Sequence, residues 1–298
     1  MIDYSKFVKN SRKWLSQYIK NNHLQSIIIG VSGGIDSTVS CAISYPVCKE
    51  LNIPLIGRSL PTTTNKPDEN SVAKLVGKAF CTDFKEVPIK DSFNFISSDL
   101  ILNEGPVTKL QEGNIKARLR MIYLRHLASI HKGVVLDNDN FTEWNLGFWT
   151  VGGDSPMDIN LGLHYLWKTE IYELAYYLYN TYKELGQSNL HMEESFGFND
   201  ISRTKAIYES VKLTPTDGNG VSNSDCEQFG LDNYEQVDDV LKTMYYPKEL
   251  SIGKHDEHYI RLIDSYNEQG VDKVMVLHQN TEYKRIPAPI KPTKDELF

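Results

Sequence analysis

Cysteine is scarce in this sequence, and the features that it lacks narrow the classes of protein to which it can belong. The four cysteines (Cys41, Cys48, Cys81 and Cys226) include no Cys-x-x-Cys pair, which fits reduced thiols in a cytosolic protein. No apolar run is long enough to cross a membrane, and the first residues are too polar for a signal peptide. The net charge of −7 provides no broad basic surface for nucleic acid. We therefore expect a cytoplasmic protein that contacts neither nucleic acid nor a membrane.

The pattern of apolar residues predicts a single α/β domain over residues 1–298. Strands are predicted near 27–31, 53–61, 84–89 and 134–138, and helices at 4–21, from 37 onward, at 66–80 and at 113–133. Strands that alternate with helices imply a mostly parallel sheet flanked by helices. In such sheets ligands gather at the carboxyl ends of the strands.

A glycine turn follows the first predicted strand, in the string Ser32-Gly33-Gly34-Ile35-Asp36-Ser37. No lysine follows the glycines, so the turn is not the nucleotide loop of kinases and GTPases, and adjacent glycines do not fit the dinucleotide-binding turn. A glycine turn that opens a helix directs backbone N–H groups and the positive end of the helix dipole at one point, which favours phosphate. The alternative is an ordinary strand-to-helix turn with a serine cap.

This string resembles the pyrophosphate loop of the N-type ATP pyrophosphatases, which have a Rossmann-like fold of the adenine nucleotide alpha hydrolase type. Enzymes of that superfamily split ATP between its α and β phosphates, transfer AMP to a substrate oxygen and release pyrophosphate. The resemblance implies that Asp36, at the end of the loop, holds Mg²⁺ on the pyrophosphate.

Later stretches resemble the ammonia-dependent NAD synthetases over nearly the whole chain. They are "GNIKARLRMIYL" from residue 113, "DNDNFTEWNLGFWTVGGDSPMD" from 137, "PTDG" from 215 and "EYKRIPAP" from 282. The resemblance implies a ligase that adenylates the nicotinate carboxylate of deamido-NAD, after which ammonia displaces AMP. Adenylation makes chemical sense because a free carboxylate has a poor leaving group.

The same resemblance assigns roles to individual residues. Asp36 and Glu143 would bind Mg²⁺, and Asp36 and Lys168 would be catalytic. Deamido-NAD would be bound by Arg118, Asp154, Asp158 and, in the C-terminal tail, Lys284. The predicted ATP contacts are Gly30, Ser32, Gly33, Gly34, Asp36, Ser37, Asn138, Lys168 and Thr216.

Four positions depart from the family pattern. Asp137 and Asn138 stand where Gly-Thr is usual, and Asp137 is expected to bring bulk and negative charge near the phosphates. Val151 replaces a substrate lysine, and Tyr283 replaces a histidine. Two alternatives therefore stay open: another adenylating amide- or thio-transfer enzyme of the superfamily, or a nucleotide-binding homologue without catalysis.

Three further expectations concern dynamics, assembly and the nitrogen donor. The polar stretch at about 185–232 is either a mobile lid or a disordered excursion. The family resemblance implies a homodimer, for which Phe7, Trp14, Tyr18 and the 113–131 helix offer apolar surface, unless these side chains are buried within one subunit. Only 31 residues precede Ser32, too few for a glutamine amidase domain, so free ammonia is the expected donor.

Overall fold

Five short strands form one parallel sheet in the computed structural model, which describes residues 2–188, 200–245, 257–285 and 291–297. The strands lie in the order β3-β2-β1-β4-β5. β1 is central because Ile27 and Ile28 pair with β2 on one side and with β4 on the other. The strands are β1 (Ser26–Gly30), β2 (Leu55–Ser59), β3 (Asp83–Glu86), β4 (Gly133–Asp137) and β5 (Ile159–Asn160).

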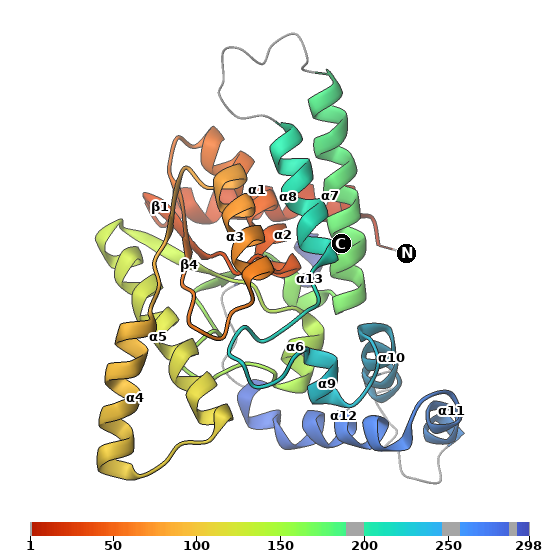
Figure 1. Ribbon diagram of the computed structural model, residues 1–298. Helices are drawn as coiled ribbons and strands as arrows, with labels where there is room; N and C mark the ends of the chain where they lie inside the picture. The colour runs from red at the N-terminus through yellow and green to blue at the C-terminus, as the bar shows by residue number, and fades with distance from the viewer. Residues whose placement is uncertain (1, 189–199, 246–256, 286–290, 298) are drawn as a thin grey trace.

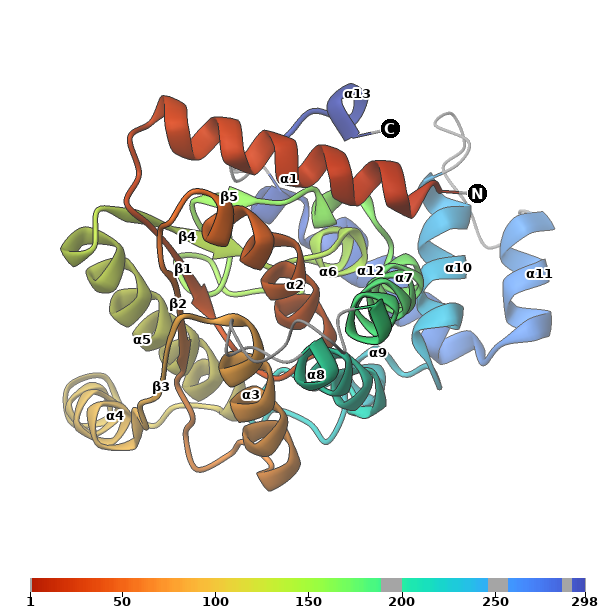
Figure 2. The ribbon, with the colours of Figure 1, turned by 90° about the horizontal axis from the view of Figure 1, so that it is seen from above.

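Helices cover both faces of this sheet (Figures 1 and 2). Alternate strand residues point to opposite faces, so Ile28 packs in one apolar cluster with Leu124, while Ile27 and Ile29 belong to the cluster on the other face. The first helices of the chain are α1 (Tyr4–Asn21), α2 (Ile35–Glu50), α3 (Pro67–Phe80), α4 (Lys90–Glu104) and α5 (Lys109–Ile130). The α5 face of the sheet and the α1–α2 face therefore have separate cores.

The second half of the chain is mainly helical. Phe229, Val237, Leu262 and Val274 form part of a further apolar cluster, which lies beside the sheet domain (Figure 1). The elements are α6 (Phe141–Leu146), η1 (Leu163–Tyr165), α7 (Lys168–Ser188), α8 (Asp200–Lys212), α9 (Asp225–Phe229), α10 (Tyr234–Tyr245), α11 (Glu257–Ser265), α12 (Glu268–Asn280), η3 (Glu282–Arg285) and α13 (Lys294–Leu297).

The predicted α/β class with a parallel sheet is confirmed. The sequence pattern did not indicate α4, in which only Ser97 is buried, because a helix with so little buried surface has a weak apolar stripe. Residues 189–199 of the predicted lid lie outside the described residues. The described part contains α8 and α9, and its mobility stays a prediction.

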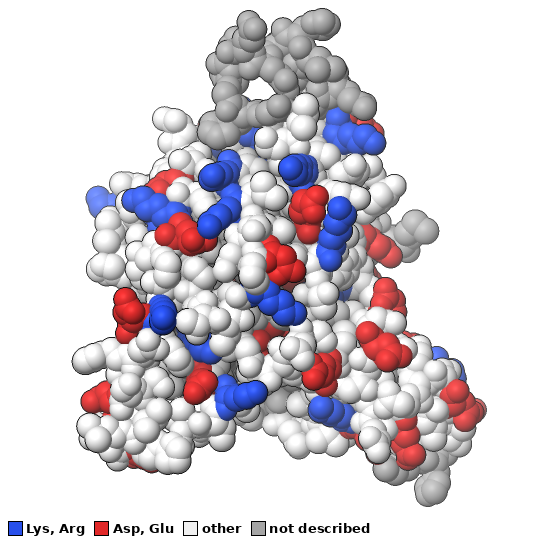
Figure 3. All heavy atoms as spheres, viewed as in Figure 1, with Lys and Arg blue, Asp and Glu red and all other residues white. Residues whose placement is uncertain are grey.

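Apolar surface is distributed differently from the expectation for a dimer. Phe7 is fully buried in the core of its own chain, so the prediction that it offers surface to a second subunit is wrong. Trp14 and Tyr18 stack on each other at 5.1 Å and are partly buried against the same core. Two of the most exposed apolar side chains lie instead on α4, where Phe95 is 77% and Leu102 84% exposed. Few charged side chains interrupt this region in Figure 3.

The order of the strands places the carboxyl ends of β1 and β4 next to a cavity. β1 pairs with both β2 and β4, so the direction in which the chain adds strands reverses at β1. Crevices at such a reversal, beyond the carboxyl ends of the strands, are the usual ligand sites of parallel sheets. None of the described helices is long and apolar enough to span a membrane.

Candidate functional site

The glycine turn joins β1 to α2 and packs directly on α3. Gly33 has φ of +89°, and a Cβ atom at this position would lie 2.7 Å from the carbonyl oxygen of Glu69. Only glycine fits both requirements. Gly34 is the N-cap of α2 and offers no side-chain cap, so the first turn of the helix opens toward the cavity. Ser32 accepts a hydrogen bond from the N–H of Gly34 and lies 3.1 Å from the hydroxyl of Ser37. The turn therefore has the geometry of an anion site.

A cavity of about 290 Å³ lies against this turn. It is bordered by the carboxyl ends of β1 and β4, by the first turns of α2 and α7, and by the 213–218 segment that follows α8. Of the residues predicted from the sequence, it brings together Gly30, Ser32, Gly34, Asp36, Ser37, Asn138, Glu143, Asp154, Lys168 and Thr216. Gly33, Arg118, Asp158 and Lys284 do not line it.

One lysine joins the two predicted metal ligands inside the cavity. The ammonium nitrogen of Lys168 lies 2.6 Å from Oδ2 of Asp36 and 2.9 Å from Oε1 of Glu143. Asn140 donates to the other oxygen of Asp36 at 2.9 Å. Burial raises the pKa of Glu143 to about 7, with Lys168 opposing the rise and Asp36 adding to it. Burial lowers the pKa of Lys168, but the two carboxylates outweigh it and raise that pKa well above its usual range.

The balance of charge in the cavity bears on whether Mg²⁺ fits there. Seven acidic side chains line it (Asp36, Glu69, Asp139, Glu143, Asp154, Asp217 and Asp225), against three basic ones (Arg58, Arg120 and Lys168). A nucleoside triphosphate is itself strongly negative, so it needs additional cations to bind in such an acidic cavity. Carboxylate oxygens are the ligands that Mg²⁺ prefers. The donor set at Asp36 and Glu143 therefore fits this metal.

Arg120 of α5 is a cavity residue that sequence reasoning missed. Its guanidinium donates to the side chain of Asn219, to the carbonyl of Gly218 and to that of Leu60. Lys116, one turn earlier, is buried and donates to the carbonyl of Asn219 at 2.8 Å. The two cations hold the 216–220 segment over the cavity. Their spacing of four residues, which places side chains on one helix face, is the signal that could have identified the pair.

Asp225, the first residue of α9, is a second cavity residue that was missed. One carboxylate oxygen accepts from the hydroxyl of Tyr234 at 2.9 Å, and the other is buried without a hydrogen-bond partner among the described residues. The ring of the same tyrosine lies under the ammonium of Lys168, 5.1 Å from it. Burial raises the pKa of Asp225 to about 6, against the opposing charge of Lys168. A buried, partly unpaired acid beside a buried lysine is typical of a functional site.

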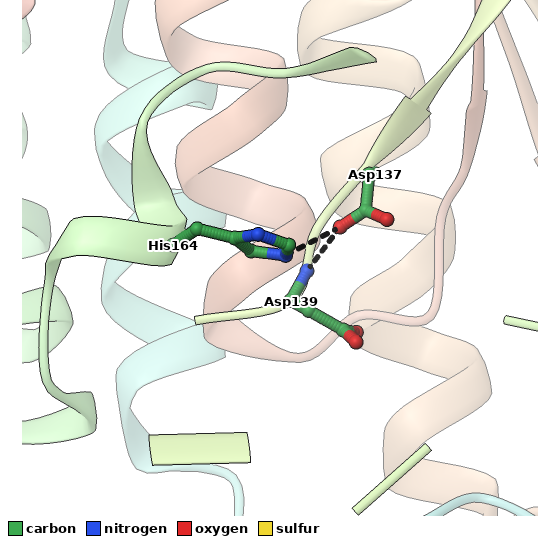
Figure 4. Close-up of side chains that lie close together, drawn as sticks. All are labelled: Asp137, Asp139 and His164. Carbon is green, nitrogen blue, oxygen red and sulfur yellow. Dashed lines mark hydrogen bonds and ion pairs between the residues drawn. The ribbon is translucent and has the colours of Figure 1, made fainter. Parts of the chain in front are cut away.

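Asp137 does not bring charge to the phosphate site as expected. Its side chain is fully buried, does not line the cavity and lies beside His164, with their closest atoms 3.3 Å apart (Figure 4). Asp137, Asp139 and His164 have ligand atoms within 4.8 Å of one another. However, the carboxylate of Asp139 points away from the imidazole in Figure 4, and that of Asp137 is filled by hydrogen bonds from the protein. We therefore treat Asp137 and His164 as a buried pair in close contact and not as a metal site.

Of the predicted substrate residues, Asp154 alone lines the cavity. Asp154 lines it and accepts from the N–H of Thr150 at 2.6 Å, and burial raises the pKa of Asp154. Arg118 is exposed, and its Nε donates to the backbone carbonyl of Val151 at 3.3 Å. Val151, at the position where a lysine is expected, is itself 46% exposed.

Asp158 and Lys284 are held by other parts of the protein. Asp158 accepts from Arg125 and from the N–H of Val135. Lys284 donates to the carbonyls of Gly147 and Trp149 at 2.7 and 2.6 Å. Their roles toward a substrate stay predictions, because in this structure both side chains already have partners within the chain.

The parallel sheet, the uncapped glycine turn and the acidic cavity define a nucleotide-binding α/β protein. A family model described as NAD synthase matches residues 7–288. The chain is 26% identical to an NH(3)-dependent NAD(+) synthetase of Thermoplasma volcanium over 98% of this chain and 100% of that one. It is 35% identical to one of Mycoplasma genitalium over 59% of this chain and 68% of that one.

Solved structures agree in fold. An NMN synthetase of Francisella tularensis matches with a TM-score of 0.70 and 22% identity, over 97% of this chain and 98% of that one. An NH3-dependent NAD synthetase of Campylobacter jejuni, in complex with the nitrate ion, matches with a TM-score of 0.65 and 21% identity, over 97% and 99%. The chain belongs to the NAD synthase family, and it is therefore an ATP-dependent ligase.

Proposed function

We propose that the chain converts deamido-NAD to NAD, with ATP as co-substrate and ammonia as nitrogen donor. The observation that carries this proposal is the meeting of Asp36, Glu143 and Lys168 at one point, directly beside the glycine turn. ATP bound with its phosphates at the turn would present its α phosphate to an acid entering from the side of Asp154. The relatives named NH(3)-dependent NAD(+) synthetase support the same reaction.

The proposed reaction divides the work among few side chains. Mg²⁺ held by Asp36 and Glu143 would neutralise charge on the departing pyrophosphate. The N–H groups of the glycine turn and the first turn of α2 hold phosphate oxygens. Lys168 supplies a cation where negative charge develops during transfer. Arg120, Asn138 and Thr216 line the same cavity. Together with Asp36, Glu143 and Lys168 they form what we call the ATP side.

The identity of the acid substrate depends on the outer side of the cavity. We assign deamido-NAD to Arg118, Asp154, Asp158 and Lys284. A second candidate is the corresponding mononucleotide, because the fold also matches a protein described as NMN synthetase. The observation that favours it is Val151, an exposed apolar side chain at the position where the dinucleotide would meet a lysine. The loss of a cation at this position removes one contact from the larger substrate.

Ammonia is the proposed donor because the cysteines do not suit a glutaminase. Cys41, Cys48 and Cys81 are buried in the core, and burial raises the pKa of Cys48 to about 12. Cys226 is half-buried, and burial together with Asp225 raises its pKa to about 11. A catalytic cysteine requires the opposite shift, because its thiolate is the nucleophile. The cytoplasmic location stays a prediction from the sequence.

The proposed homodimer would use the exposed apolar side chains of α4 and α5. Leu102, Leu110 and Ile122 are all more than half exposed, and nothing in the described chain covers them. Leu102→Asp is expected to convert a dimer into a monomer in sedimentation at micromolar concentration. Ile260→Asp, at an exposed position on α11, is the matched control. A wild-type chain that sediments as an active monomer would refute the dimer.

The test of the proposed function is pyrophosphate release by purified protein with ATP and Mg²⁺. Deamido-NAD, the mononucleotide acid and unrelated acids are supplied in parallel, with ammonium or with ammonium-free glutamine. We expect release with deamido-NAD, and NAD formation with ammonium only. A preference for the mononucleotide selects the second candidate. Release with other acids alone points to another adenylating enzyme, and no release with any acid points to a nucleotide-binding homologue.

A further inference from the structure

The carboxylate of Asp137 joins segments that are distant in the sequence. One oxygen accepts from the N–H of Asp139 at 3.0 Å and from the amide of Asn160 at 3.1 Å. The other accepts from the hydroxyl of Ser155 at 3.0 Å and from the N–H of Met157 at 2.7 Å. A single buried side chain at the end of β4 therefore connects the 138–143 segment of the ATP side with residues 155–160.

His164 closes this arrangement on its far side. Its Nε2 lies 3.3 Å from Asp137 (Figure 4). The centre of its ring lies 4.7 Å from that of Trp144. Trp144 in turn stacks on Trp149 at 5.2 Å with nearly parallel planes. The ammonium of Lys284 lies 5.5 Å from the Trp149 ring. A continuous column of rings thus runs from Asp137 to the residue predicted to contact the substrate from the C-terminal tail.

The charge on Asp137 makes these contacts mutually dependent. Burial by itself would raise the pKa of this carboxyl, but His164, Met157 and Asn160 outweigh it and lower the pKa. A buried carboxylate that loses a donor keeps the desolvation penalty without the compensation. The segments that supply the donors are consequently held in one position. Neither Asp137 nor His164 lines the cavity, so any effect on catalysis must pass through these segments.

We propose that Asp137 and His164 form a positioning pair, which fixes the 150–160 segment and the ring column relative to the ATP side of the cavity. The pair acts on affinity for the acid substrate and leaves affinity for ATP nearly unchanged. This inference rests on the proposed function, because the 150–160 segment carries the substrate residues Asp154 and Asp158 only if that function holds.

The first test is steady-state kinetics of Asp137→Asn, which keeps the shape of the side chain but replaces one acceptor oxygen by a donor. We expect KM for the acid substrate to rise about tenfold, with KM for ATP changed less than about twofold, since small misplacements of binding groups weaken binding strongly. His164→Ala is expected to shift the same constant in the same direction. Val76→Ala, a buried α3 position remote from the pair, is the control for general destabilisation.

The second test needs no substrate and so separates this inference from the proposed function. Backbone hydrogen exchange in residues 150–160 is expected to accelerate about tenfold in Asp137→Asn and in His164→Ala, but not in Val76→Ala. If the wild type is inactive toward every acid, the proposed function fails while the exchange result still decides the positioning role. Unchanged exchange in both variants, or an equal rise of both KM values, would overturn the inference. If Asp137→Asn does not fold, His164→Ala decides.

Discussion

The two sides of the cavity differ in how their functional side chains are paired. On the ATP side, Asp36, Glu143 and Lys168 contact one another and face the cavity. On the substrate side, Asp158 is paired with Arg125, and Lys284 is bound to backbone carbonyls. The ATP side is therefore organised before any ligand arrives. Asp158 and Lys284 are instead held by other parts of the chain and do not line the cavity, so the motif matches on this side do not converge at one point.

The largest expected effect comes from a substitution on the ATP side of the cavity, which tests the difference between the two sides most directly. Asp36→Asn removes the negative charge that Lys168 contacts and that would hold Mg²⁺, while the side chain keeps its shape. We expect adenylation to fall about 1,000-fold, measured as pyrophosphate release with ATP and deamido-NAD. Asp68→Asn, an exposed acid in the first turn of α3, is the matched control. Near-normal pyrophosphate release by a folded Asp36→Asn protein would contradict the proposed role of Asp36 as an Mg²⁺ ligand.

A substitution of Asp225, which lies on the same side of the cavity, is expected to have a smaller effect. It should change activity and stability in opposite directions. Its pKa is about 6 in the folded protein and 3.8 in its ordinary state, so folding favours the protonated acid. The stability that this preference provides is present below pH 4 and is lost as the pH rises through 6. Asp225→Asn should therefore stabilise the protein at pH 8 by about 2 to 3 kcal/mol, and reduce activity about tenfold by removing charge beside Lys168.

The measurement is chemical unfolding of wild type and variant at pH 5 and pH 8, together with pyrophosphate release. Asp83→Asn provides a control of opposite sign, because the hydrogen bond from Arg58 lowers the pKa of Asp83 despite partial burial. That variant should lose stability at pH 8. A destabilised Asp225→Asn protein at pH 8 contradicts the interpretation of Asp225 as a strained acid kept for function.

The smallest expected effect comes from restoring a cation on the substrate side of the cavity. Val151→Lys places an ammonium beside Arg118 and Asp154, at the position where the family pattern has lysine. If deamido-NAD is the substrate, its KM should fall about fivefold, as expected for a solvent-exposed ion pair. Val151→Gln is the neutral control. A lower KM for the mononucleotide alone would support the second candidate function instead.

The glycine turn was predictable because its constraints are local. Neighbouring residues decide whether a strand can turn into a helix there, and the string 32–37 contains them, whereas the packing of Gly33 on α3 is not visible in that string. The parallel sheet followed for a similar reason, since alternation of strands and helices is visible along the chain. Arg120 was missed although it stands two positions after Arg118, because the helix turns the two side chains to different surroundings.

The surroundings of Asp137 were harder to predict. Alternation along β4 places its side chain on the same face as Val135, which packs toward α5. The strand pattern alone therefore predicts the face of the sheet on which the Asp137 side chain lies. The donors that neutralise the charge come from residues 155–164, and their approach depends on how the intervening loop folds back. Sequence spacing alone does not specify such a return.

The position of Gly33 against α3 has a consequence for evolution within the family. A side chain at this glycine would collide with the backbone of Glu69 and Ala73, so the glycine is required for packing as well as for the proposed binding of phosphate. A descendant that changed its substrate, or lost catalysis, would still be selected to keep this glycine. Recognisable ancestry in this superfamily can therefore outlast the reaction, and changes of specificity should be sought at positions free of such packing, as Val151 is.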